Sequence, residues 1–268
     1  MAVTRERLDV YLVNNGFFPS REKARAAVMA GLVFVDGERV DKPGHPVKAE
    51  VKVQVQGNKL PYVSRGGLKL EKAIKAFKID LKDRVVIDIG ASTGGFTDCA
   101  LQNGASLVYA VDVGYGQLAW KLRSDPKVIS MERTNVRYLE PEALPEKPSF
   151  ATIDVSFISL ALVLPRVDLL TEPMTEGVAL IKPQFEAGRE RVGKKGVVRD
   201  PAVHVEVIEK ILRIVHDLGW QVAGLDFSPV RGPEGNIEYL LYFTKGQQGK
   251  FIEPKVQEIV KCAHGTRE

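Results

Sequence analysis

After about residue 67, short apolar runs alternate with segments whose apolar residues have helical spacing. The segment 69–77, for example, places Leu70, Ala73, Ile74 and Phe77 on one side of a helix. Further helices are expected at 95–104, at 116–125, from about Ser159 and at 202–218. Seven near-continuous apolar runs predict buried strands at 84–90, 107–114, 128–135, 150–157, 177–183, 220–230 and 236–245. Such strands, alternating with helices, predict a mostly parallel sheet covered on both faces.

The last two predicted strands differ from the others because only a short turn-like segment, PVRGPEGN, joins them. A connection this short predicts an antiparallel hairpin at one edge of the sheet. Seven strands with this ending indicate the α/β fold class, with a seven-stranded Rossmann-like sheet of the methyltransferase type.

The front of the chain has a different pattern. Segments 5–16 and 20–31 have helical spacing, and residues 32–40 and 51–55 alternate as short strands do. This pattern predicts a small α+β domain. The expected organisation is a front domain at 1–58, a polar linker at 59–66, a catalytic domain at 67–246 and a tail at 247–268 with a helix at about 254–262.

Composition narrows the class of protein. With 44% hydrophobic and 27% charged residues, the chain has the composition of a soluble globular protein. It has no apolar run near the ~18 residues that span a bilayer, and its start lacks the apolar stretch of a signal peptide. Cys99 and Cys262 lack metal-type spacing, so we expect a reduced cytoplasmic setting, with no metal and no membrane.

Basic residues are concentrated in two segments of a chain whose net charge is only +4. Residues 1–67 hold 11 Lys/Arg against 7 Asp/Glu, and residues 182–199 hold 6 against 2. Two basic surfaces suit a polyanionic partner. Ordinary solvated faces give the same pattern, so charge alone does not decide the partner.

Ligands of doubly wound sheets bind at the carboxyl ends of the strands. The first strand ends in DIGASTGGF, where small residues let a ligand approach the backbone. The turn has no G-x-G-x-x-G and no P-loop lysine, and its leading carboxylate repels a pyrophosphate but suits the ammonium of S-adenosylmethionine. The predicted cofactor contacts in this turn are Asp88, Gly90, Ser92, Gly94, Gly95 and Phe96.

Two further strand ends complete the expected cofactor site. Asp112, with Val113, stands at the end of the second strand, where a carboxylate can accept hydrogen bonds from ribose hydroxyls. Asn135 follows the third strand and can meet an adenine edge, and Asp154 follows the fourth. Tight packing explains a glycine-rich turn alone but not these polar residues as well. We therefore expect S-adenosylmethionine as the cofactor.

The remaining strand ends indicate which atom accepts the methyl group. Methylation of a pyrimidine carbon often uses a cysteine, but Cys99 lies in a predicted helix and Cys262 in the tail. Methylation of a base nitrogen commonly uses an Asn/Asp-Pro-Pro-aromatic turn, where this chain reads DVSF. The strand ends and the first helix instead offer two lysines and two carboxylates, Lys69, Asp154, Lys182 and Glu238.

Two lysines and two carboxylates can activate a ribose hydroxyl, which is a poor nucleophile because it stays protonated near neutral pH. An ammonium flanked by carboxylates can hold the hydroxyl in line with the methyl group and lower its pKa. A lysine with a depressed pKa can also act as the base. Each residue alone has an ordinary structural explanation, and spacing does not prove that the four converge.

Seven segments resemble the TlyA family of ribosomal RNA 2′-O-methyltransferases, often described as haemolysins. The resemblance covers about residues 5–245 and is carried by VSRGGLKL, DIGASTGGFTD, DVGYGQLAWKLRSDP, ERTN, DVSFISL, KPQFE and SPVRGPEGNIEY. The catalytic domain is also similar to the FtsJ-type ribose methyltransferases. Their Lys-Asp-Lys-Glu tetrad falls on Lys69, Asp154, Lys182 and Glu238.

The resemblance also implies the partners. The front domain resembles the S4-like RNA-binding domain, and the family's acceptor is a cytidine of ribosomal RNA in the large subunit and, in some members, the small subunit. Ribosomal RNA and ribosomal subunits are therefore the expected partners. The RNA contacts expected in and after the front domain are Arg5, Arg7, Arg21, Lys23, Arg25 and Arg65.

The segment after Lys182 is too long for a plain connection in a compact domain. We interpret it as a loop that closes over RNA, and a loop without contacts is the alternative. Its expected phosphate contacts are Arg189, Arg191, Lys194 and Lys195.

Two other functions stay open at this point. A membrane-active haemolysin lacks support in a chain without a spanning segment or a strongly amphipathic basic helix. A non-catalytic RNA-binding assembly factor is disfavoured by the intact tetrad. The modified nucleotide, the oligomeric state and the use of the tail are not predicted.

Overall fold

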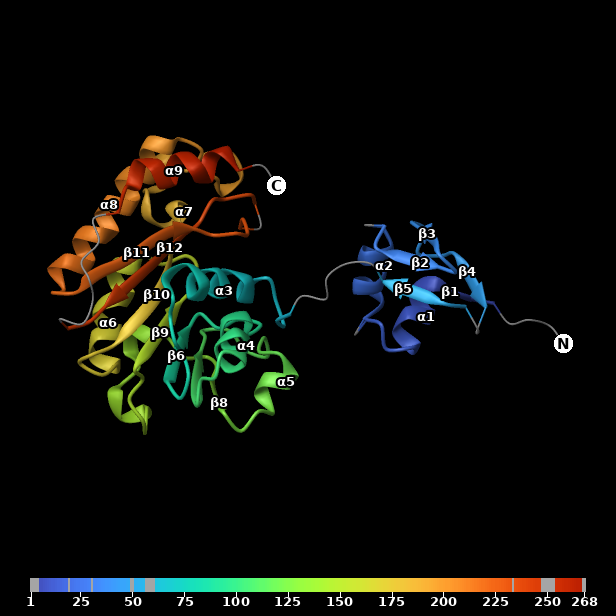
Figure 1. Ribbon diagram of the computed structural model, residues 1–268, viewed down its shortest axis with the longest axis horizontal. Coiled ribbons are helices and arrows are strands. Elements are labelled where there is room, and N and C mark those ends of the chain that lie inside the picture. The colour runs from blue at the N-terminus through green and yellow to red at the C-terminus, as the bar shows by residue number, and fades with distance from the viewer. Residues whose placement is uncertain are drawn as a thin grey trace. The chain divides into compact units, whose positions relative to one another are not determined.

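The computed structural model describes residues 5–18, 20–29, 31–48, 51–55, 61–232, 234–246 and 254–266. The chain forms two compact units, Met1–Lys59 and Leu60–Glu268 (Figure 1). The start of the expected linker, at 59–60, and the tail residues 247–253 lie outside the described residues.

The first unit packs two helices on short strands. Its elements are β1 (Arg5–Arg7), α1 (Leu8–Asn14), α2 (Arg21–Met29), β2 (Val33–Val35), β3 (Glu38–Val40), β4 (Pro46–Lys48) and β5 (Val53–Val55). β2 pairs with β3 and β5 in an antiparallel sheet, and β1 pairs with β4. The helix expected from Arg5 was wrong at its start, because Arg5–Arg7 has no apolar residue to bury and pairs with β4 instead.

The second unit contains the predicted seven-stranded sheet. Its strands are β6 (Val85–Ile89), β7 (Leu107–Val111), β8 (Val128–Met131), β9 (Phe150–Ile153), β10 (Glu176–Ile181), β11 (Gln221–Phe227) and β12 (Tyr239–Thr244). Their order is β11-β12-β10-β9-β6-β7-β8. β12 is antiparallel to both of its neighbours and the other pairs are parallel, so the hairpin expected at the sheet edge is confirmed.

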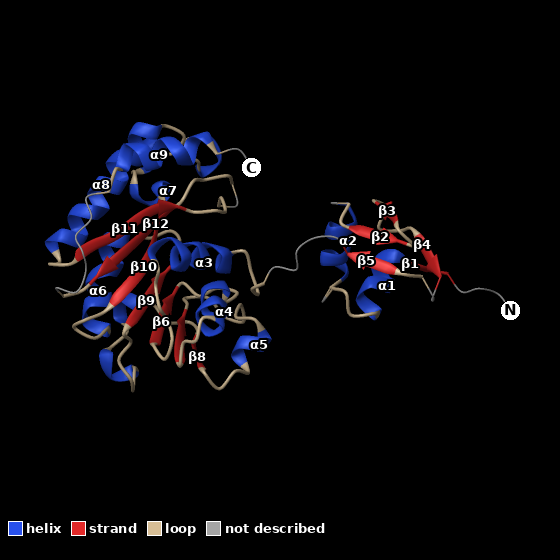
Figure 2. Ribbon diagram, in the orientation of Figure 1, coloured by secondary structure: helices blue, strands red, loops and turns tan. Residues whose placement is uncertain are grey.

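Helices lie on both faces of this sheet (Figure 2). They are α3 (Gly66–Phe77), α4 (Gly95–Gln102), α5 (Trp120–Arg123), α6 (Leu160–Leu170), α7 (Pro183–Glu186), α8 (Pro201–Asp217) and α9 (Val256–Gly265). The helix expected at 116–125 shrinks to α5, because other segments bind the backbone before it: Gln117 N donates to Glu132 and Ala119 N to Thr93 O. In the described part of the chain, no helix combines the length and apolar composition that crossing a membrane requires.

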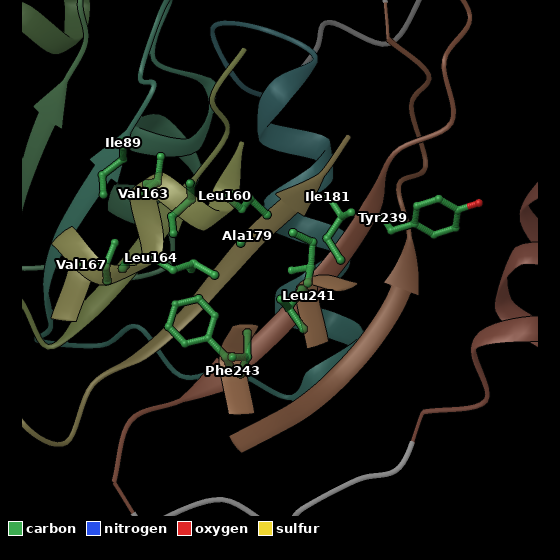
Figure 3. Close-up of a cluster of buried hydrophobic side chains, with 14 of the residues drawn as sticks. Ile89, Leu160, Val163, Leu164, Val167, Ala179, Ile181, Tyr239, Leu241 and Phe243 are labelled. Carbon is green, nitrogen blue, oxygen red and sulfur yellow. The ribbon is translucent and has the colours of Figure 1, made fainter. Parts of the chain in front are cut away.

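Strand alternation builds two cores on the two faces of the sheet. One core contains Ile89, Ile181 and Phe243 and packs against α6 (Figure 3). Helices α8 and α9 also contribute to this core. The other contains Val86 and Leu180 and packs against α3 and α4. Because β6, β7, β9 and β10 run parallel, the segments that follow them emerge together at one edge of the sheet.

Candidate active site

Four charged side chains from distant parts of the chain line one cavity of the second unit. Lys69 lies in the first turn of α3, and its Nζ is 2.6 Å from Glu238 Oε2 and 3.3 Å from Asp154 Oδ2. Lys182 follows β10, and its Nζ is 2.6 Å from Asp154 Oδ1. The structure thus brings together the four residues that the strand ends and the first helix offer, as a contact chain of alternating charge.

These four side chains can be buried because the two lysines contact the two carboxylates, so that their charges balance. Glu238 is only 3% exposed at its side chain and Asp154, the most accessible of the four, 17%. Burial disfavours the charged form of Lys69, but the Asp154 and Glu238 carboxylates outweigh burial and raise the pKa of Lys69. Lys69 therefore favours its ammonium form near neutral pH.

A second cavity adjoins the first. The cavity with the four charged residues has a volume of about 310 Å³ and the second about 410 Å³. Four residues line both, Gly90, Ser92, Asp154 and Ser156. The expected cofactor residues that line one or both cavities are Gly90, Ser92, Gly95, Phe96, Asp112, Val113, Asn135 and Asp154.

The turn after β6 depends on glycine. Gly90 has φ +88°, and a Cβ added to it would lie 2.5 Å from the Asp154 carbonyl oxygen. Gly95 packs against Ser64 with no space for a side chain, and Gly94, with φ +95°, packs against Leu122 and lines neither cavity. Gly90 therefore lets the turn pack closely against the end of β9 at the wall of both cavities, whereas Gly94 serves helix packing.

Polar groups suited to a nucleoside line the second cavity. Asp112 Oδ2 accepts from Ser92 N at 2.8 Å, and Oδ1 accepts from Gly114 N at 2.7 Å. A carboxylate offers about four lone-pair sites, so these two bonds leave it able to accept from hydroxyls. Asn135 begins a short 3₁₀ turn and accepts from Arg137 N at 3.1 Å. These residues fit an adenosyl group.

Asp88, which the sequence predicts as a cofactor contact, has a buried side chain. It is 1% exposed and lines neither cavity. The Thr97 and Thr152 hydroxyls donate to its two oxygens at 2.6 Å and 2.9 Å. Burial raises the pKa of Asp88 to about 6 despite these hydrogen bonds. The carboxylate ties β6 to β9 and α4 and so supports the turn, while its contact with the cofactor stays a prediction.

Sequence reasoning missed three residues of the site. Ser156 Oγ accepts from Lys182 Nζ at 3.1 Å. Phe157 has φ +64°, is 91% exposed and contacts the Phe185 ring with centroids 5.0 Å apart. Arg231 lines the cavity of the four charged residues. A bulky residue at positive φ marks a strained site, but backbone angle and cavity position are not readable from one sequence.

The expected RNA contacts of the first unit fall into two groups. Asp9, with a fully buried side chain, takes hydrogen bonds from Arg7 Nε and Arg21 Nε at 3.0 Å each. The bond from Arg7, opposed by burial and aided by Arg21, lowers the pKa of Asp9. Lys23 and Arg25 are exposed on α2. The side chain of Arg5 lies outside the described residues, and Arg65 lines the first cavity of the second unit.

The segment 187–199 is structured. Arg189–Arg191 and Lys194–Gly196 form 3₁₀ turns. Val198 is buried, and its N donates to Asn236 Oδ1 at 3.3 Å. Arg191 pairs with Glu206 on α8. The four expected phosphate contacts, Arg189, Arg191, Lys194 and Lys195, are exposed.

An antiparallel β12 between β10 and β11, with a glycine turn after β6 that opens on a nucleoside-sized cavity, defines an S-adenosylmethionine-dependent methyltransferase. Residues 62–245 match the FtsJ-like methyltransferase family, and residues 6–53 match the S4 domain. The chain belongs to the TlyA/hemolysin A family of rRNA methyltransferases.

Several known proteins are similar in sequence to this chain over most of its length. YqxC of Bacillus subtilis, whose assignment as an rRNA methyltransferase is itself provisional, is 54% identical over 99% of this chain and 96% of its own. The 16S/23S rRNA (cytidine-2′-O)-methyltransferase TlyA of Mycobacterium tuberculosis is 44% identical over 89% of each chain. A solved structure from Streptococcus thermophilus, described provisionally as a hemolysin, has 51% identity and a TM-score of 0.77 over 98% of this chain and 97% of that chain.

Proposed function

We propose that this protein transfers a methyl group from S-adenosylmethionine to the ribose 2′-hydroxyl of a cytidine in ribosomal RNA. The observation that carries the proposal is the buried contact chain beside the turn at Gly90, formed by Lys182, Asp154, Lys69 and Glu238. The choice of a cytidine rests on TlyA of Mycobacterium tuberculosis, whose name states that acceptor.

The two adjoining cavities suggest how the cofactor is held. S-adenosylmethionine supplies, when bound, a methyl group that its sulfonium makes electrophilic. In our proposal Asp112 accepts hydrogen bonds from the ribose hydroxyls, and Asn135 contacts the adenine edge. The cofactor would lie against the backbone of Gly90, which lines both cavities.

Lys182 is the side chain that we assign to the acceptor oxygen. Asp154 Oδ1, at 2.6 Å, and Ser156 Oγ, at 3.1 Å, fix its Nζ. An ammonium against the 2′-oxygen lowers the pKa of that hydroxyl and orients it. Asp154 accepts the hydroxyl hydrogen bond and takes the hydroxyl proton as the oxygen gains the methyl group, which leaves S-adenosylhomocysteine. Lys69, whose pKa is raised, keeps its charge and anchors the other Asp154 oxygen.

Ribosomal RNA is the proposed substrate because the first unit matches an S4 domain. The exposed Lys23 and Arg25 of α2 suit phosphates, and so do the exposed Arg189, Lys194 and Lys195 of the second unit. Arg65, in the cavity itself, suits an anion close to the reacting atoms.

The test maps 2′-O-methyl marks in the ribosomal RNA of cells that carry or lack this protein. We expect one or a few cytidine marks to disappear with the protein and to return when it is supplied. Supply of Lys182→Ala should not restore them, because the acceptor oxygen loses its ammonium. Supply of Lys147→Ala, an exposed lysine, should restore them fully.

Purified protein separates a catalytic defect from a folding defect. Lys182→Ala should lower turnover by about 100-fold or more, since transition-state contacts of this kind contribute several kcal/mol. Its affinity for S-adenosylhomocysteine should stay within several-fold of the parent, as measured by calorimetry. Near-normal turnover of Lys182→Ala would remove it from the proposed mechanism. Methyl marks on a base instead of a ribose would overturn the assigned acceptor.

A further inference from the structure

Arg231 lies in the segment that joins β11 to β12 and lines the cavity of the four charged residues. Its Nη2 donates to the Thr266 carbonyl oxygen, 2.9 Å away, directly after α9. The backbone beside it is fixed as well, since Gly232 N donates to Asn236 O at 2.9 Å. Arg231 is therefore a half-buried basic side chain held in place at the cavity wall.

The lining of this cavity carries more positive than negative side chains. Its charged members are Arg65, Lys69, Asp154, Lys182, Arg231 and Glu238. The two lysines contact the two carboxylates, so the positive excess of the lining comes from the two arginines. A cavity lined in this way favours an anion beside the reacting groups.

An RNA chain places such an anion next to the reacting atom. The 2′-hydroxyl and the 3′-oxygen are on neighbouring ribose carbons, and the 3′-oxygen carries a phosphodiester. A guanidinium matches phosphate oxygens with paired N–H donors. We propose that Arg231 binds the phosphodiester on the 3′ side of the nucleotide to be methylated. This inference rests on the proposed function and makes Arg231 a residue that sets the rotation of the ribose toward Lys182.

The carboxylate of the cofactor is the other anion that fits this charge. Arg65 is the better placed of the two arginines for it, because Arg65 directly precedes α3, whose first residue Gly66 packs beside Gly95 in the cofactor turn. Arg231 instead belongs to the segment that leads to Glu238 and the acceptor side. We therefore assign the phosphodiester to Arg231, and the test separates the two anions.

The test removes the two partners of the contact one at a time. Arg231→Ala removes the guanidinium, and a semi-synthetic ribosomal RNA with one methylphosphonate 3′ to the mapped nucleotide removes the phosphate charge. We expect each change alone to lower kcat/KM by about 10- to 100-fold. On the methylphosphonate RNA, the parent protein and Arg231→Ala should differ by less than about twofold. Losses that simply multiply would overturn the proposal.

Matched variants and a cofactor measurement complete the design. Arg231→Lys keeps the charge but not the fork and should fall between the parent and Arg231→Ala. Arg213→Ala, which removes an exposed arginine of α8, should behave as the parent. Affinity for S-adenosylhomocysteine, measured without RNA, should be unchanged in Arg231→Ala. A tenfold loss there would assign Arg231 to the cofactor carboxylate and contradict the phosphodiester assignment.

The parent protein alone also tests the proposal, through RNA that carries a methylphosphonate on one or the other side of the nucleotide. A methylphosphonate on the 3′ side of the nucleotide should lower kcat/KM at least several-fold more than one on its 5′ side. Equal effects would overturn the proposal even if Arg231→Ala failed to fold. Ribose methylation of the natural RNA in the same assay keeps the proposed function standing whichever way these outcomes fall.

Discussion

Gly90 connects β6 to the two cavities and has a backbone conformation that residues with a side chain rarely adopt. Its φ is +88°, and the Asp154 carbonyl oxygen lies 2.5 Å from where a Cβ would be. Any larger residue must therefore push the end of β9 away from the turn. Because Asp154 also belongs to the contact chain, the same movement would disturb both cavities.

Gly90→Ala is expected to lower S-adenosylhomocysteine affinity at least about tenfold and to destabilise the protein by about 1–3 kcal/mol. Gly219→Ala is the matched control, because Gly219 has φ +72° with nothing within 4 Å of an added Cβ. The control should lose stability but not affinity. Calorimetry and urea unfolding measure the two effects, and an equal loss of affinity in both variants would contradict this account of the turn.

Asp88 makes a second prediction at this scale, one of pH dependence. Its pKa of about 6 lies above its ordinary value, so between pH 4 and 6 the folded protein holds a proton that the unfolded chain has released. Raising the pH through this window therefore removes stability. Asp88→Asn does not titrate, so it should gain stability relative to the parent as pH rises, on the order of 2–3 kcal/mol in total.

Urea unfolding at several pH values checks this expectation. Asp217→Asn, at a carboxylate that is 79% exposed, should follow the parent curve throughout. Parallel curves for Asp88→Asn and the parent would show that Asp88 is ionised in the folded state as readily as in the unfolded chain.

The sequence placed Asp88 at the end of the first strand of the large sheet, but it did not show what the Asp88 carboxylate binds. The hydroxyls that donate to this carboxylate belong to Thr97 of α4 and Thr152 of β9. Their positions along the chain follow no spacing that would have predicted these hydrogen bonds. The same holds for Arg21, whose partner Asp9 lies in the preceding helix. Strand ends, in contrast, predicted Lys182 and Asp154, because parallel strands bring their carboxyl ends to one edge.

At the scale of elements, α2 carries two kinds of basic residue. Arg21 is bound to the buried Asp9, whereas Lys23 and Arg25 are exposed on the same helix. Neutralising Arg21 therefore changes the stability of the first unit as well as its charge. Only Lys23 and Arg25 report on RNA binding without this complication.

The double variant Lys23→Gln, Arg25→Gln should weaken RNA binding and reduce the slope of log affinity against log salt by about 1–2. Its melting temperature should match the parent. Filter binding to ribosomal RNA over a series of KCl concentrations measures the slope. The double variant Lys147→Gln, Arg213→Gln, at two exposed positions of the other unit, is the charge-matched control. An unchanged slope would remove α2 from the RNA contacts.

Helices and strands were predictable where burial gives the apolar residues a regular spacing. They were not predictable where strand pairing or local hydrogen bonds determine the structure. The sheet strands and the hairpin of β11 and β12 follow from long apolar runs. β1 and β4 were missed because each has three residues and is defined by its partner. The segment 116–125 has helical apolar spacing, but the backbone N–H groups of Gln117 and Ala119 donate to Glu132 and to the Thr93 carbonyl oxygen instead of forming helix hydrogen bonds.

At the scale of the whole molecule, the two units have separate cores of unequal size. The first unit ends at Lys59 and buries mainly Val, Leu and Ala side chains. Domains of this size bury a smaller fraction of their surface and are marginally stable. The second unit has extensive cores on both faces of its sheet. The two units should therefore unfold separately.

We expect two transitions in urea, with the first unit unfolding at the lower concentration. The chain has 2 Trp, Trp120 and Trp220, both in the second unit, so Trp fluorescence should report only the later transition, and far-UV circular dichroism both. S-adenosylhomocysteine at about 100 times its Kd should add about 2.7 kcal/mol to the later transition alone. One shared transition for both probes would show that the units unfold together.

The position of β12 matters during synthesis. It is the last sheet strand to be translated, yet it lies between β10 and β11. Until Thr244 has left the ribosome, β10 keeps an open edge and β11 lacks both its neighbour and a place in the sheet. Open strand edges recruit other chains, and translation adds only about 5–20 residues per second. Chains that terminate before Tyr239 therefore keep that edge permanently, which marks them for aggregation or proteolysis.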